Sequence, residues 1–211
     1  TIAAEVSEEG FLNASIPMSA FEEDITVDED GRIILELVRM AAKVSIRMDR
    51  SRLSKDVEMT VRSVRIGNFP KYAYAVGPSK VSSVHDRYDR GFLLTTQQCE
   101  SLNSTGPGGI SGEVSLFMLE NMQGDFPHDI SDDEEKILEP EDPLHEKASY
   151  LELEIDYRSP ELISYDSSLI YRFYLGGSRK DLDMERNCHY HILVSPEDDG
   201  LKGDGWRVDK S

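Results

Sequence analysis

The sequence has little of what marks a membrane-spanning or disulfide-stabilised protein. No apolar run approaches the ~20 residues that a helix needs to cross a bilayer. No signal peptide and no lipid-attachment cysteine opens the chain, and its first residues resemble the interior of a longer sequence. Only Cys99 and Cys188 are present, and they permit at most one disulfide. We therefore expect a fold that does not depend on disulfides, and we expect further sequence before residue 1 of this chain.

Positive charge is also scarce. The 211 residues include 41 acidic and 23 basic side chains, which gives a net charge of −18. A chain this acidic repels nucleic acid and anionic lipid, so we exclude both as main partners. The hydrophobic content of 38% and the single tryptophan are typical of a globular protein that is long enough to bury a core.

Motifs of phosphate-binding loops and of catalytic nucleophiles are missing as well. The glycines within residues 106–109 and 200–205 do not follow the Gly-x-Gly-x-x-Gly order between a strand and a helix. No Gly-x-Ser-x-Gly sequence occurs. The residues around Cys99 do not mark it as a nucleophile, so we interpret it as a plain thiol or half of a disulfide. We expect no catalytic residue, and hence a protein that is not an enzyme.

Candidate metal ligands are few and poorly spaced. His189 and His191 would share one face of a strand next to Cys188 and could supply two arms of a zinc site, but no third ligand has a recognised spacing. The acidic run at residues 125–146 could attract calcium, yet it lacks the Asp-x-Asp-x-Asp-Gly order of a calcium loop. We interpret the histidines as surface residues of a strand and the acidic run as a solvated loop. We expect no metal site and no cofactor.

What the sequence does contain is alternation of apolar and polar residues. Large apolar side chains recur at every second position in two segments: Leu169, Tyr171, Phe173 and Leu175 in the first, and Tyr190, Ile192 and Val194 in the second. Because side chains alternate across a strand, this spacing predicts two half-buried strands, with the two histidines on the outer face of the second. The polar residues 177–185 between them predict a long loop. We interpret residues 171–194 as a hairpin in an antiparallel sheet.

The same pattern predicts six strands along the chain. They span residues 34–48, 57–66, 114–119, 150–157, 169–175 and 190–194. Local propensity at residues 40–43 would allow a helix, but the alternating apolar positions around it favour a strand. The apolar positions change parity between Val61 and Val64, which predicts a bulge near Arg62 and Ser63. The whole chain is therefore predicted to be all-β, an antiparallel β-sandwich with little helix.

Two segments have weaker patterns. Residues 1–30 are short apolar pieces among acids, and Pro17 would interrupt a central strand, so we expect an edge strand or a connecting segment. Residues 67–112 are rich in Gly, Pro and Ser and predict long loops. Cys99 falls in this region, whereas parity with Tyr190 places Cys188 inward as a small buried group. A disulfide needs Cα atoms within about 7 Å, which two unrelated positions rarely satisfy, so we expect free thiols.

Several pieces of the sequence carry a resemblance when they are taken in order. They are residues 16–19 (Ile-Pro-Met-Ser), 37–44 (Leu-Val-Arg-Met-Ala-Ala-Lys-Val), 117–124 (Phe-Met-Leu-Glu-Asn-Met-Gln-Gly), 148–153, 174–176 and 185–192. Across residues 15–195 their order and spacing resemble the fimbrillin superfamily, the type V pilus subunits and anchors of Bacteroidales bacteria.

That resemblance implies a fold and a domain organisation. The family has two transthyretin-like β-sandwich domains in tandem, made as outer-membrane lipoproteins and exported to the cell surface. Residues 31–211 would then be the C-terminal β-sandwich domain, and residues 1–30 a linker or the last strand of a missing N-terminal domain. The lipid anchor would lie outside this chain.

The resemblance also implies a function in cell adhesion. Family members do no catalysis and polymerise by donating a strand into a neighbour's sheet, so the implied partners are other fimbrial subunits and the implied location is the fimbrium. No catalytic, cofactor-binding or metal residue is carried over, because this function resides in sheet edges and grooves. Polymerising subunits continue into a C-terminal donor segment, whereas in this chain residues 195–211 are short and polar, with Trp206 and Val208 as large apolar anchors. We therefore expect an anchor or accessory subunit, unless the chain is truncated at its C-terminus.

Two other functions stay open from the residues alone. Trp206 and the tyrosine-rich strands could offer stacking platforms, so a glycan-binding β-sandwich is the main alternative, and a hydrolase or metalloenzyme is the third. Exposed aromatic side chains along a polar groove would favour sugar binding, whereas buried ones would favour the fimbrial interpretation.

Overall fold

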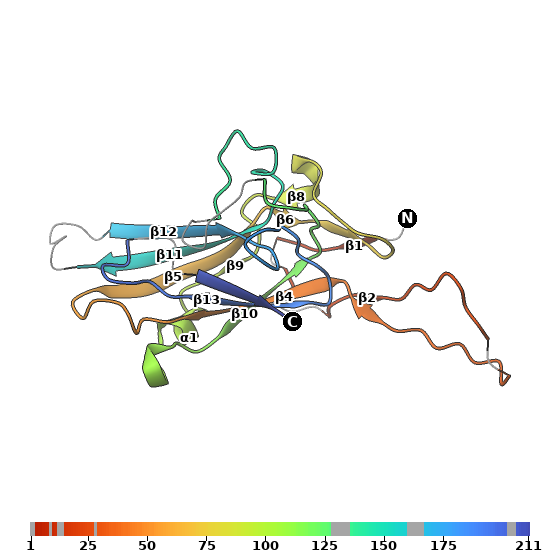
Figure 1. Ribbon diagram of the computed structural model, residues 1–211, viewed down its shortest axis with the longest axis horizontal. Helices are drawn as coiled ribbons and strands as arrows, with labels where there is room; N and C mark the ends of the chain where they lie inside the picture. The colour runs from red at the N-terminus through yellow and green to blue at the C-terminus, as the bar shows by residue number, and fades with distance from the viewer. Residues whose placement is uncertain are drawn as a thin grey trace.

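Two four-stranded sheets form the body of the protein in a computed structural model, which describes residues 3–8, 10–11, 15–27, 29–127, 136–159, 167–201 and 206–211. The first sheet has the strand order β10-β4-β13-β14, with bounds Val114–Leu119, Ala41–Met48, His189–Val194 and Trp206–Lys210. The second has the order β12-β11-β5-β9, with bounds Ser167–Tyr174, Tyr150–Arg158, Glu58–Gly67 and Leu93–Leu94. Figure 1 shows the two sheets lying along an elongated body.

The inner faces of the two sheets share one core. Val44 and Ile46 of β4 are fully buried, as are Val64 and Ile66 of β5. All four belong to a single apolar cluster that also contains side chains of β10, β11, β12 and β13. Each long strand thus places one apolar face in the core and one polar face outward. The prediction of an all-β sandwich is confirmed, while the transthyretin-like detail stays a prediction.

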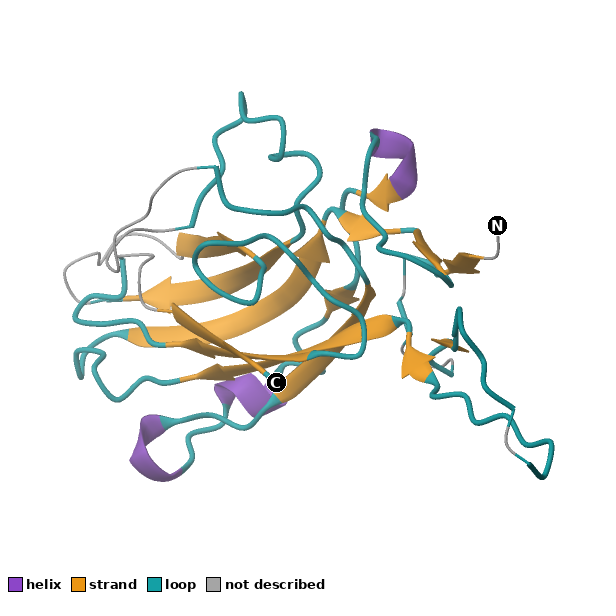
Figure 2. Cartoon of the chain, turned by 45° about the vertical axis from the view of Figure 1, so that its right-hand side comes forward, coloured by secondary structure: helices purple, strands orange, loops and turns teal. Residues whose placement is uncertain are grey.

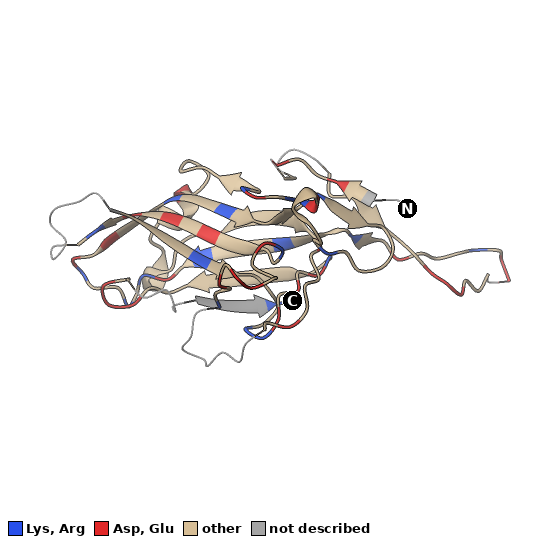
Figure 3. Ribbon diagram, turned by 90° about the horizontal axis from the view of Figure 1, so that it is seen from above, with Lys and Arg blue, Asp and Glu red and all other residues tan. Residues whose placement is uncertain are grey.

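Charged side chains cover the outer face of the second sheet, where Figure 3 shows acidic and basic positions on adjacent strands. Glu152 of β11 accepts a hydrogen bond from Arg172 Nε of β12 at 2.9 Å and pairs on its other side with Arg65 of β5. Cross-strand pairs of opposite charge stabilise neighbouring strands. The charged residues that alternate with the buried ones therefore form ion pairs across three strands, and these pairs help to fix the register of the strands.

The predicted bulge is present in β5. Glu154 lies opposite Ser63, and the next residue, Ile155, lies opposite Val61, so Arg62 is the extra residue. The insertion lets both Val61 and Val64 reach the core despite their different parity. The change of parity in the sequence therefore located the bulge correctly.

The predicted hairpin at residues 171–194 was wrong. β12 pairs antiparallel with β11 in the second sheet, whereas β13 pairs with β4 and β14 in the first. β4 and β13 run parallel, which requires a crossover between sheets. The connection between β12 and β13 is also not a solvated loop, because Leu182 and Met184 within it are fully buried. Alternation identifies a strand but does not identify its neighbour.

Most strand boundaries agree with the predictions to within a few residues, and β10 agrees fully. The first predicted strand is too long, since residues 34–37 are exposed and lie in no strand. After them come β3 (Val38–Arg39), which pairs with β2 (Met18–Ser19), and then β4. β14 was not predicted, because its alternation is short and lies in a polar tail.

The remaining elements are short. β1 (Ala3–Glu5) pairs with β7 (Tyr72–Tyr74), and β6 (Phe69–Pro70) pairs with β8 (Arg87–Tyr88). The helical turns are η1 (Val84–Asp86), α1 (Glu100–Asn103) and η2 (Pro107–Gly109). Residues 67–112 are thus mostly loops, as predicted (Figure 2). No helix in the described part of the chain is long and apolar enough to cross a membrane.

Candidate functional site

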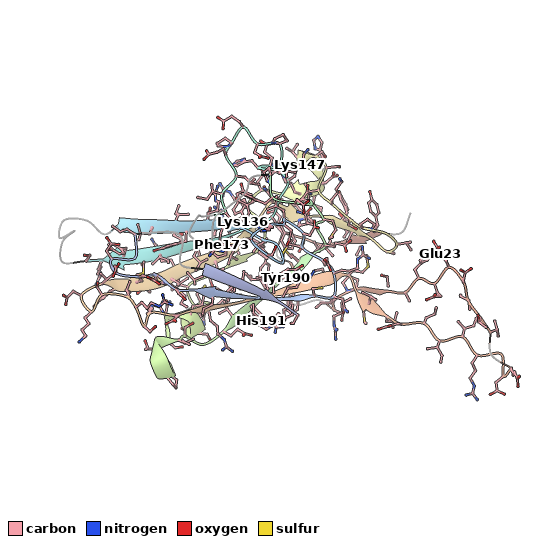
Figure 4. The ribbon with its side chains drawn as sticks, in the orientation of Figure 1. Glu23, Lys136, Lys147, Phe173, Tyr190 and His191 are labelled. Carbon is pink, nitrogen blue, oxygen red and sulfur yellow. The ribbon has the colours of Figure 1, made fainter. Side chains whose placement is uncertain are left out.

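The two histidines singled out by the sequence lie on the outer face of the first sheet. In β13, Tyr190 and Ile192 are buried, His189 is half-buried and His191 is exposed, as the alternation predicted. The two imidazole centroids are only 3.7 Å apart, and His191 is labelled on the strand in Figure 4. They therefore form one cluster rather than two separate surface residues.

Ser45 of β4 joins this cluster to β10. Its Oγ lies 2.7 Å from His189 Nε2 and donates to Glu113 Oε1 at 3.0 Å. Glu113 contacts the serine and not the imidazole, so the three side chains do not reproduce the order of a catalytic triad. Ser45 is only 2% exposed, which keeps its oxygen from a substrate. The arrangement is a hydrogen-bonded network across neighbouring strands.

Burial and two neighbouring side chains oppose protonation of the histidine in this network. Burial lowers the pKa of His189, His191 and Lys43 lower that pKa further, and the raising effect of Glu113 is the smallest. Burial alone would raise the pKa of Glu113, but the bond from Ser45 and the charge of Arg47 outweigh it, so this pKa lies below its ordinary value. At neutral pH the network therefore holds a neutral His189 beside an ionised Glu113.

A hollow of about 290 Å³ opens beside this network, between β4, β13 and the segment before β10. Arg47, Glu113 and His191 supply its polar lining. Within the described ranges, no three His, Cys, Asp or Glu side chains are placed to hold a metal ion. The structure brings the two predicted histidines together, and the described residues offer them no third ligand of these types.

Both cysteines are free thiols. Cys99 is fully buried directly before α1, and burial raises its pKa to about 11. Cys188 is half-buried and packs against the core, and burial raises its pKa too. Since the thiolate is the reactive form of cysteine, neither side chain is prepared to act as a nucleophile at neutral pH.

The acidic run contains a buried cation that sequence reasoning missed. Lys136 is 1% exposed, and its Nζ donates to the carbonyl oxygens of Leu175, Ser178 and Asp181 (Figure 4). Burial lowers its pKa to about 8, against the raising effect of the Asp181 carboxylate. The prediction of a solvated loop was therefore wrong for Lys136 and Leu138, which are buried, while residues 128–135 lie outside the described part. The one signal in the sequence was Lys136-Ile137-Leu138, a non-acidic triplet after four acids.

The tyrosines of the long strands are not a sugar-binding platform. Tyr157, Tyr171, Tyr174 and Tyr190 are all buried. Tyr174 packs edge-on against the ring of Tyr150, with centroids 5.7 Å apart, over a small second core. Burial of these rings argues for structural roles. The side chain of Trp206 lies outside the described residues.

The strand edges are the surfaces on which a sandwich can bind another chain. β10 and β12 each pair with a single neighbouring strand among the described residues, so each is the edge of its sheet, although Tyr174 N at the end of β12 donates to the carbonyl oxygen of Lys136. Ile170 of β12 adds an exposed apolar side chain. β13, by contrast, has neighbours on both sides, because β14 pairs with it from Tyr190↔Lys210 to Val194↔Trp206. The C-terminal tail is thus engaged in the chain's own sheet.

Comparisons with known proteins agree on the fold. Residues 116–194 match the family described as "Domain of unknown function (DUF4906)", and no curated protein matches the sequence. A proposed cell adhesion protein from Bacteroides eggerthii superposes with a TM-score of 0.54 at 12% identity, over 100% of this chain and 68% of its own. The tip fimbrial protein Mfa3 from Porphyromonas gingivalis, with a C-terminal truncation, gives 0.51 at 13% identity, over 100% of this chain and 68% of its own.

Proposed function

On the premise that this chain resembles the fimbrillin superfamily in sequence and in fold, we propose that it is a cell-surface fimbrial subunit of anchor or accessory type. It joins partner subunits through its sheet edges, by β-strand complementation. Its place is the outer membrane or the fimbrium, and it attaches to the membrane only through a lipid anchor that lies outside residues 1–211.

The state of the C-terminal tail is the observation that carries the anchor or accessory assignment. A subunit that extends a polymer from its C-terminus must release a segment into its neighbour. In this chain β14 forms five residue pairs with β13 of the same molecule. An intramolecular partner competes at a high effective concentration with any neighbouring molecule. Residues 206–210 are therefore paired within the chain and are not free to pair with a neighbouring molecule.

Open edges on both sheets support partner binding. β10 and β12 have no strand on their outer side among the described residues, and open edge strands are templates for pairing with another chain. An extended partner segment would gain affinity from backbone hydrogen bonds and selectivity from every second side chain. This function needs no catalysis, which is consistent with a buried Ser45 and protonated thiols.

Immunogold electron microscopy of native cells, with antibodies against this chain, tests the proposal. We expect gold at one place on each fimbrium, at its base or its end. Labelling along the whole shaft would contradict the anchor or accessory assignment, and the absence of label from fimbriae would contradict the proposed function itself.

A glycan-binding domain is a second candidate, and one observation favours it. Tyr72 and Tyr74 stand on the same face of β7, and they are 43% and 47% exposed. Neighbouring aromatic faces of this kind can stack on sugar rings. A glycan array probed with the wild-type chain and with a Tyr72→Ala, Tyr74→Ala variant distinguishes the two functions, because only a sugar site gives a signal that the variant loses.

A further inference from the structure

A long arm projects from one end of the molecule. It begins where β2 pairs with β3, at Met18↔Arg39 and Ser19↔Val38. Between these strands the chain runs out beyond the sheets and returns (Figures 1 and 2). We define the arm as residues 20–27 and 33–37.

The arm exposes an unusual concentration of apolar side chains. Seven large ones are exposed: Phe21, Ile25, Val27, Ile33, Ile34, Leu35 and Leu37. Ile34 is 92% exposed, the highest value among the exposed large hydrophobic residues of the described chain. Single exposed apolar residues are ordinary, but a contiguous set marks an interaction surface.

The pattern of these residues is that of a strand without a neighbour. Most of the apolar side chains stand at odd positions, which are 21, 25 and 27 in one limb and 33, 35 and 37 in the other, and Ile34 is the exception. The strand predicted from residue 34 rested on the even positions 38 to 48, so residues 33–37 have the opposite parity to β4. Yet residues 20–27 and 33–37 form no backbone hydrogen bond with any described residue. The limbs have the composition of strands, and their backbone groups are available to a partner.

A cleft of about 450 Å³ continues the apolar surface from the arm to the body. Phe21 and Leu35 form its arm side, and the turn after β7 forms the other side with Val76 and Pro78. Glu120 and Arg186 complete the lining. The arm and the cleft are therefore one continuous surface.

The charged part of the cleft is rigid. Arg186 Nη2 lies 2.6 Å from Glu120 Oε2, and Arg186 Nε donates to Glu120 Oε1 at 3.0 Å. The same guanidinium also donates to the carbonyl oxygen of Gly77 at 2.9 Å. A bidentate pair of this kind holds both side chains in one orientation, so the wall of the cleft is set before a partner arrives.

The charge of the arm indicates what kind of surface can bind it. The two limbs carry Glu22, Glu23, Asp24 and Glu36 and no Lys or Arg, and the residues between them add further acids and one basic residue, Arg32. Figure 3 shows the projecting segment marked mainly by acidic positions. A second copy of this chain would meet these carboxylates with its own net charge of −18, which opposes self-association. The complementary surface is an apolar one with Lys and Arg at its rim.

We propose that the arm and the cleft together dock onto a second β-sandwich subunit, at a sheet edge whose apolar residues are bordered by Lys and Arg. A limb of the arm adds to that edge as a strand, and the alternate apolar side chains pack onto the partner's sheet. This inference rests on the proposed function and names the surface through which one partner binds.

The first experiment compares two variants of the full chain. The probes are the purified fimbrial subunits encoded beside its gene, each added separately in a calorimetric titration. The test variant is Ile33→Ser, Ile34→Ser, Leu35→Ser, and the control is Val84→Ser, which changes a side chain of similar exposure on η1. We expect the test variant to raise the Kd for one subunit at least about tenfold and the control to leave it unchanged. Thermal midpoints should stay unchanged for both, because the altered side chains are exposed.

The second experiment places a photo-crosslinking amino acid at position 34 or, as the control, at position 84. We expect a covalent adduct with the same subunit from position 34 only, mapped to a strand edge bordered by Lys or Arg.

Unchanged binding by the triple variant would overturn the docking proposal and leave the proposed function standing. Arm-dependent self-association in sedimentation would make a second copy the occupant and would also overturn it. If no such subunit binds the wild-type chain, the proposed function fails, and this inference fails with it.

Discussion

At the scale of single residues, the most demanding feature is the cation inside the acidic segment. Lys136 exchanges water for three backbone carbonyls between β12 and β13, and burial lowers its pKa to about 8. Those carbonyls belong to the crossover that carries the chain from one sheet to the other. The lysine therefore supplies hydrogen-bond partners to three carbonyl groups of this connection, which also bonds to other segments through its backbone.

This burial predicts a pH dependence of stability. Between the folded pKa of about 8 and the unfolded value of 10.5, only the unfolded chain still holds the proton, so the free energy of unfolding rises with pH. Relative to a Lys136→Met variant, the wild type should gain about 3 kcal/mol across this window, from the shift of its pKa. Urea unfolding at several pH values measures the difference. The exposed Lys55→Met control should show no such trend, and a flat difference for Lys136 would contradict its burial as a cation.

The thiols give a second prediction at this scale. Cys99 is fully buried with a pKa raised to about 11, whereas Cys188 is only half-buried. A thiol reagent at neutral pH should therefore modify Cys188 first and Cys99 only when the chain unfolds. Counting thiols in denaturant should find both. A count of none would mean that the two are joined in a disulfide.

At the scale of elements, alternation located the long strands because each of them has one buried and one solvated face. β10 and the bulge at Arg62 followed directly from that pattern. The pairing of the strands could not be predicted, because no residue pattern in β12 or β13 indicates that they belong to different sheets. The histidine face of β13 was foreseen, but Lys136 and the Arg186–Glu120 pair were not, because their partners come from distant parts of the chain.

The junction of β5 and β11 offers a test of packing between elements. Gly67 lies opposite Tyr150, and a Cβ on Gly67 would lie 1.9 Å from Tyr150 Cζ. Gly67→Ala should therefore force the ring away and lower stability by about 1–3 kcal/mol, measured by thermal or chemical unfolding. In a Tyr150→Ala background the same substitution should cost much less, because the ring is gone. Equal costs in both backgrounds would contradict the contact.

The tail offers a test of edge protection. Deleting residues 206–211 removes β14 and opens β13 to other molecules. We expect the shortened chain to unfold at a lower temperature and to bind a peptide of residues 201–211 along the open edge, which restores the thermal midpoint. A shortened chain that is equally stable and does not bind the peptide would show that β14 does not cover this edge.

At the scale of the whole molecule, some surfaces are covered by contacts within the chain and others are left open to partners. The core, the ion pairs and the β13–β14 ladder complete the sandwich within one chain. The edges of β10 and β12 and the arm leave backbone and apolar groups for other molecules. A net charge of −18 keeps copies of the chain apart and favours a different, basic partner. These properties support the proposal of an accessory subunit that joins an assembly without propagating it.

Hydrogen–deuterium exchange tests this account most directly, on the isolated chain and on its complex with a fimbrial subunit encoded beside it. Strand pairing buries backbone N–H groups in hydrogen bonds, so it slows their exchange. The account predicts a monomer whose residues 33–37 exchange quickly, and a complex in which these residues become strongly protected while β4 and β11 stay unchanged. A complex with no added protection in the arm or along β10 and β12, or long polymers of the isolated chain, would contradict assembly by strand complementation in an accessory subunit.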